Sequence, residues 1–216
     1  MSEREIEEVK EDIMLRKGFW LNLLVALPLV FLFGCSDFGK VDQGRVVRYD
    51  KEKRIVTIIR DVKHDPMNPD YSHLPPFAYS LPTDPMETGP EPKAGGRMKL
   101  DKDKKVIIIF NPETQNFKTI DIQIVDMKEN VERQDPLVYD SDAKQARTFP
   151  VVDKGKKTVT IYSGRQKLFI AFTMPEEYFA MPDSTWDAGD EARIYYKQEG
   201  KALRFMNVTT TDIFKK

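Results

Sequence analysis

Short stretches rich in Val, Ile, Thr, Tyr and Phe recur along the chain between clusters of turn-forming residues, and no longer window shows a helical repeat of apolar positions. Segments of this length and composition are typical of β-strands. The run 106–110 is apolar throughout, which predicts a strand buried on both faces, while 119–124 alternates strictly and predicts one buried face. We therefore expect an all-β protein, with further strands at 45–49, 55–59, 158–162, 168–173, 192–196 and 203–208.

The candidate strands resemble one another in the two halves of the chain. Residues 55–58 correspond to 158–161, and residues 77–82 correspond to 170–175. This similarity favours an internal duplication of a β unit of about 70 to 85 residues, with chance similarity between two β-rich halves as the alternative.

The expected architecture is two small β units of the SH3-like or OB-like kind. The first unit spans 44–127, residues 128–147 form a linker, and the second unit spans 148–216.

The N-terminal 34 residues have the order of a secretory signal peptide. A basic pair, Arg16 and Lys17, precedes an apolar run at 19–33, and Leu32-Phe33-Gly34 is followed by Cys35. This arrangement resembles the lipobox of bacterial lipoproteins, so we expect cleavage after Gly34 and lipidation of Cys35. The apolar run is shorter than the roughly 20 residues that a spanning helix needs, which makes an uncleaved anchor the weaker alternative.

The acidic lead at 1–13 does not suit a signal peptide, so translation is expected to begin at Met14. Cys35 is the only cysteine, so the mature chain, which begins with a tether at 35–43, has no disulfide. Ser36 stands where an aspartate commonly retains lipoproteins in the inner membrane of enteric bacteria. The expected location is therefore the cell envelope, on the periplasmic face of the outer membrane, with the lipid bilayer contacted through acylated Cys35.

Charge excludes one large class of partner. The whole chain carries a formal net charge of −1, and its acidic and basic residues are interspersed. A nucleic-acid-binding protein usually presents a basic face to the phosphate backbone, so no nucleic-acid partner is expected.

A proline-rich tract at 61–76 contains both histidines of the protein. Proline cannot donate to a sheet ladder, so the tract is expected to be an extended surface loop, and loops of this length are often functional. We regard it as a partner or ligand loop, with five candidate residues: His64, Asp65, Asp70, Tyr71 and His73. Two imidazoles and a carboxylate would suit zinc or copper, but their spacing matches no known site, so no metal is assigned.

Catalytic motifs are missing from the sequence. There is no Gly-x-Ser-x-Gly elbow, no cysteine besides Cys35 and no Cys-x-x-Cys-His haem motif, so we expect neither an enzyme nor a cofactor. Trp186, in a proline- and aspartate-rich stretch, is the candidate recognition aromatic. The alternative is that it closes the end of a barrel.

The segments 44–50, 193–196 and 202–209, together with the lipobox, resemble an uncharacterised lipoprotein family of sulfate-reducing bacteria, a domain of unknown function. That resemblance implies a lipoprotein and carries no activity. The expected function is a membrane-anchored, periplasm-facing lipoprotein that serves as a non-catalytic binding or scaffold module for an envelope protein complex. A small-ligand or metal-binding lipoprotein is the alternative.

Replacement of Cys35 by alanine should abolish incorporation of labelled palmitate in cells, because only the cysteine thiol can carry the lipid. Ser36→Ala is the matched control and should retain the label. Labelled Cys35→Ala protein would rule out lipidation at this residue.

Overall fold

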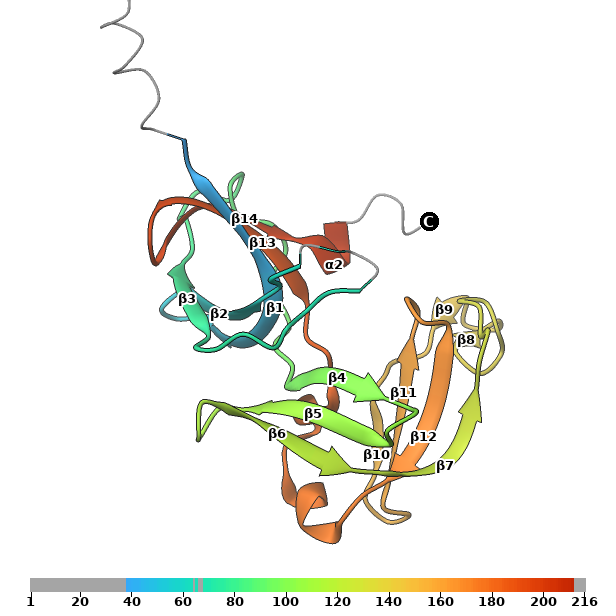
Figure 1. Ribbon diagram of the computed structural model, residues 1–216. Helices are drawn as coiled ribbons and strands as arrows, with labels where there is room; N and C mark the ends of the chain where they lie inside the picture. Colours follow the sequence, from blue (N-terminus) through green and yellow to red (C-terminus); the bar gives the residue numbers. More distant parts are fainter. Residues whose placement is uncertain (1–37, 64, 66–67, 212–216) are drawn as a thin grey trace, which may run out of the picture. The chain divides into compact units, whose positions relative to one another are not determined.

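The computed structural model describes residues 38–63, 65 and 68–211, and it confirms an all-β fold. The signal segment, Cys35 and His64 lie outside the described residues. Five strands close a barrel in the order β1 (Lys40–Asp50), β13 (Glu191–Gln198), β14 (Lys201–Asn207), β3 (Phe77–Ser80) and β2 (Ile55–Arg60) (Figure 1). All neighbours pair antiparallel except β14 and β3, which meet in parallel at Lys201 and Ser80.

Alternate residues of these strands fill the barrel, as the two-residue period of a strand requires. Val46, Ile58 and Ile194 are fully buried, and Phe205 and Tyr79 lie beside them. The barrel therefore has a core of its own.

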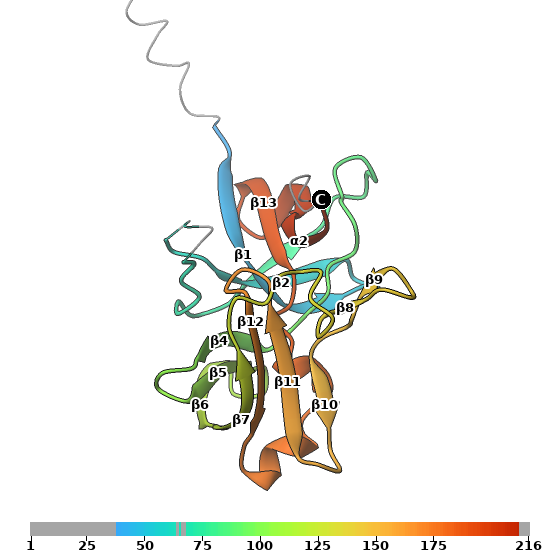
Figure 2. The same ribbon diagram turned by 90° about the vertical axis from the view of Figure 1, so that its right-hand side faces the viewer.

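Between β3 and β13 the chain builds a second β region. A three-stranded sheet contains β4 (Arg97–Asp101), β5 (Val106–Asn111) and β6 (Asn116–Asp121). Figure 2 shows the four-stranded sheet, in which β10 (Val151–Asp153), β11 (Thr158–Ser163), β12 (Leu168–Thr173) and β7 (Gln123–Lys128) lie side by side.

Only Ile122, itself buried, separates β6 from β7, so one extended segment passes from one sheet into the other. The expected single strand at 119–124 is thus divided here. The apolar faces of the two sheets share one core, which two short 3-10 helices complete, η1 (Glu176–Ala180) and η2 (Asp183–Trp186). The remaining elements are β8 (Tyr139–Asp140), β9 (Gln145–Ala146) and α2 (Val208–Thr211).

The strand pairing differs from the expected division into units 44–127 and 148–216. The hairpin β13–β14 belongs to the barrel of β1, β2 and β3, because those three strands alone would leave two unpaired edges. The expected linker at 128–147 contains the hairpin β8–β9, and its Val131 and Val138 are buried.

The expected repeat also does not match the structure, since each copy contributes strands to both regions. Strands β2 and β3 lie in the barrel whereas their counterparts β11 and β12 lie in the second region.

The repetition that the structure does show is in its hairpin turns. Six turns begin with Asp, Asn or Ser, whose side chain accepts a hydrogen bond from a backbone N–H two or three residues later. Each turn closes four residues after that first residue with a non-glycine residue at positive φ: Arg54, Lys105, Gln115, Lys144, Lys157 and Lys167. Short polar side chains satisfy turn N–H groups in this way, so one local rule shapes hairpins in both regions.

These turns predict how stability depends on pH. Hydrogen bonds from backbone N–H groups lower the pKa of Asp50, Asp101 and Asp140. A carboxyl whose pKa is lower in the folded state stabilises the fold above its unfolded pKa of about 3.9, and this contribution is lost as the pH falls through the folded value. Thermal unfolding at pH 7 and at pH 3 should therefore show a drop in Tm at acid pH.

The triple variant Asp50→Asn, Asp101→Asn, Asp140→Asn should show a smaller drop, because an amide oxygen accepts the same hydrogen bond without titrating, as Asn111 already does. The matched control is Asp121→Asn, Asp126→Asn, Asp142→Asn, at exposed aspartates that accept none of these turn hydrogen bonds. An equal drop in both triple variants would contradict the assignment.

Candidate functional site

Asp61 holds together the two ends of the first part of the proline-rich loop, residues 61–70. This carboxylate is 1% exposed and accepts hydrogen bonds from the backbone N–H of Lys63 (3.1 Å) and of Asp70 (2.8 Å). The backbone N–H of Val62 also donates to the carbonyl of Asp70 at 3.1 Å. Hydrogen bonds therefore hold Asp61 and Val62 next to Asp70, at the base of this part of the loop.

Tyr71 does not project from this loop as a recognition residue would. It is 6% exposed and packs against Ile59, Met98 and Phe110, in a small third core between the outer face of the barrel and the second region. Its ring also carries the guanidinium of Arg45, whose carbon lies 4.6 Å from the ring centroid. The expected loop residue is thus a buried anchor. Burial of a tyrosine ring removes a large apolar surface from water, which stabilises the fold.

The other candidate loop residues have different surroundings. His73 and Asp65 are exposed, and Asp70 is half-buried. Hydrogen bonds from Ser72 lower the pKa of the Asp70 carboxyl. Among the described residues no group of three or more His, Cys, Asp or Glu side chains could hold a metal ion, and His64 falls outside that set.

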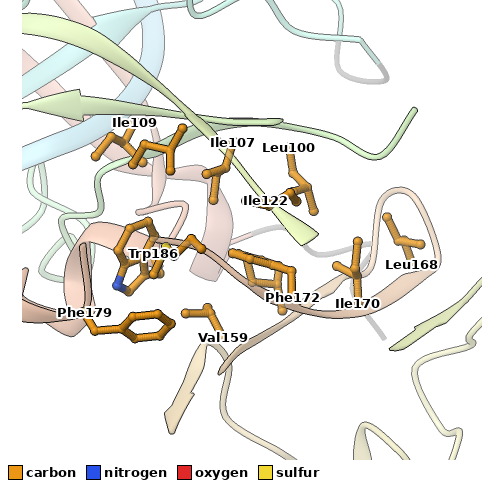
Figure 3. Close-up of a cluster of buried hydrophobic side chains, with 13 residues drawn as sticks. Leu100, Ile107, Ile109, Ile122, Val159, Leu168, Ile170, Phe172, Phe179 and Trp186 are labelled. Carbon is orange, nitrogen blue, oxygen red and sulfur yellow. The ribbon is translucent and has the colours of Figure 1, made fainter. Parts of the chain in front are cut away.

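Trp186, the candidate recognition aromatic, is buried completely, so its expected exposure is wrong. Figure 3 shows it together with Phe179, Val159 and Phe172 in the core of the second region. The 3-10 helix η2 turns the indole inward between the sheets, where a large apolar surface is removed from water. The alternative, a tryptophan that closes a β structure, describes it better.

A pocket of about 430 Å³ opens where β1, β5 and the segments around η1 and η2 meet. Its wall is mainly apolar and includes Val47, Phe110 and Met181, while Asn111 and Ser184 supply polar groups. This volume lies within the range of small-molecule sites.

Gly95 and Gly96 form one wall of the pocket. Neither position has room for a side chain, because neighbouring backbone lies too close. A Cβ at Gly95 would lie 2.2 Å from the backbone nitrogen of Gly189, and one at Gly96 would lie 2.9 Å from the carbonyl oxygen of Thr185. The pocket was not expected from the sequence. The Gly95-Gly96 pair is the signal that could have indicated it, because paired glycines often mark the close approach of two backbones.

A family model described as Domain of unknown function (DUF4881) matches residues 37–216. The chain belongs to this family. No curated protein and no solved structure matches it. Within the described part of this DUF4881 chain, no helix has the length and apolar character needed to cross a bilayer.

Two substitutions in the loop of this DUF4881 protein should show whether the Tyr71 side chain anchors the loop. Tyr71→Ala should lower the free energy of unfolding by about 3 kcal/mol, because it empties part of the third core. His73→Ala, at an exposed neighbouring position, should change it by less than about 0.5 kcal/mol. Urea denaturation of both variants measures the difference, and equal small effects would show that Tyr71 does not anchor the loop.

Proposed function

We propose that this protein is a lipid-anchored lipoprotein of the cell envelope, on the periplasmic face of the outer membrane, and that it serves as a non-catalytic binding module for an envelope protein complex. The observation that carries the proposal is the short distance in sequence between the lipobox-like Leu32-Phe33-Gly34-Cys35 and the first barrel strand, which begins at Lys40. Five residues of extended chain reach roughly 17 Å, so a lipid on Cys35 would hold the β body close to the bilayer surface.

The form of the loop supports a binding role. Asp61 and Tyr71 hold it in place, while Val62 is 47% exposed and His73 is exposed beside the anchor. A surface loop held at Asp61, Asp70 and Tyr71 loses less conformational freedom when a partner binds than a loop without such contacts, which favours affinity. A protein partner held at the membrane would use such a surface.

A second candidate function is the binding of a small, largely apolar ligand. The pocket beside Val47 and Phe110 favours it, because its volume of about 430 Å³ and its mainly apolar wall suit such a molecule. This function would place the ligand beside the third core rather than on the loop.

In-cell cross-linking followed by affinity capture from the membrane fraction tests the first proposal. The intact protein should capture a stoichiometric envelope partner, and Cys35→Ala should lose it because the unlipidated protein leaves the membrane. Deletion of the loop is unsuitable because it would remove Tyr71 from the third core. The double variant Val62→Glu, His73→Ala changes only exposed side chains and should reduce capture about tenfold, as the loss of a central contact does.

Met86→Glu is the control, since Met86 is 91% exposed in the chain between β3 and β4, away from the loop in sequence. Capture by Met86→Glu should equal that of the unchanged protein. Equal capture by the loop variant would remove the loop from the interface, and absence of any partner would favour the small-ligand function.

A further inference from the structure

Two arginines meet beside the third core, and no carboxylate of the described residues is paired with either. Nη1 of Arg45, on β1, donates to the backbone carbonyl of Arg97 at 3.1 Å, and Nε of Arg97, on β4, donates to the carbonyl of Trp186 at 3.1 Å. Among the residues that the structure describes, neither guanidinium forms an ion pair within 4.0 Å. Both side chains are half-buried. Within the described part of the chain no carboxylate is paired with their remaining N–H groups, which are partly open to solvent.

Two of the nearby acidic groups are engaged elsewhere. Asp187 forms an ion pair with Lys93 and accepts the backbone N–H of Gly189 at 3.0 Å. Glu191 pairs with Arg165 at 2.9 Å and accepts a hydrogen bond from the amide of Gln43. Burial and the charge of Arg45 lower the pKa of Arg97 to about 10. The arginine pair thus carries positive charge that its surroundings compensate poorly.

Tyr71 adds a third donor. Its ring lies against the Arg45 guanidinium, and its hydroxyl is buried with no hydrogen-bond partner among the described residues. A buried hydroxyl without a partner is costly, and the packing of Ile59, Met98 and Phe110 around the ring holds it in place. An acceptor bound beside the two arginines would satisfy this group as well.

We propose that Arg45, Arg97 and Tyr71 form a binding site for one carboxylate group. The planar fork of a guanidinium matches the two oxygens of a carboxylate, and the tyrosine hydroxyl donates to an oxygen that remains. The proposal does not depend on the proposed function.

The test uses the full chain in detergent, with sodium acetate as the probe and sodium chloride added to keep the ionic strength constant. Acetate should raise Tm along a saturable curve, by about 3–6 °C at ten times the half-saturating concentration. Arg45→Met and Arg97→Met should abolish the shift. Arg48→Met, an exposed arginine on the same strand, is the matched control and should retain it.

Tyr71→Phe keeps the test decisive if an arginine variant does not fold. It removes only a hydroxyl that has no partner, so Tm in chloride should be unchanged or higher, while the half-saturating acetate concentration should rise about tenfold. No saturable shift in the unchanged protein, or an equal loss in Arg48→Met, would overturn the site. A shift with phosphate or sulfate but not with acetate would overturn the carboxylate assignment.

Discussion

Closure of the barrel is the constraint on which the rest of the structure depends. Strands β1, β2 and β3 form an antiparallel sheet whose two outer edges, on β1 and β3, would otherwise expose unpaired N–H and C=O groups. The hairpin β13–β14 pairs with both edges, through β1 on one side and β3 on the other. Because the closing hairpin comes from residues 191–207, everything between β3 and β13 is an insertion into the barrel. The second region must therefore leave and return at the barrel, and the glycines near its two junctions, Gly95 and Gly189, meet where it does so.

The strands were largely predictable from the sequence, whereas their partners were not. The runs expected at 106–110, 158–162 and 168–173 agree closely with β5, β11 and β12, because burial on one or both faces leaves a local pattern of apolar residues. The pairing of Lys40 with Tyr196 has no such local pattern. Two β-rich halves consequently suggested two units in sequence order, and the similar hairpin turns strengthened that impression although they reflect a shared turn chemistry.

The candidate site was less predictable for a related reason. Tyr71 and Trp186 both stand in proline- and aspartate-rich stretches that suggest exposed loops, yet both are buried. In each case the backbone is irregular while the side chain fills a core, Tyr71 between barrel and insertion and Trp186 between two sheets. A sequence pattern predicts that the backbone of a segment is irregular better than it predicts whether the largest side chain of that segment is buried. The described residues of the proline-rich tract form no strand or helix, as expected. Nothing in the sequence around Asp61 indicated that its carboxylate would hold residues 61–70 together.

Two buried polar atoms without a hydrogen-bond partner among the described residues lie around the third core, Oδ2 of Asp61 and the hydroxyl of Tyr71. Nε of Arg54, at the turn before β2, and Nε1 of Trp186, in the core of the insertion, also lack one. Inside the barrel, by contrast, the carboxylate of Asp42 accepts hydrogen bonds from Tyr79 and from Arg60. Proteins tend to retain poorly satisfied polar groups where function requires them. The meeting place of barrel, loop and insertion is therefore where we propose that a ligand or partner binds.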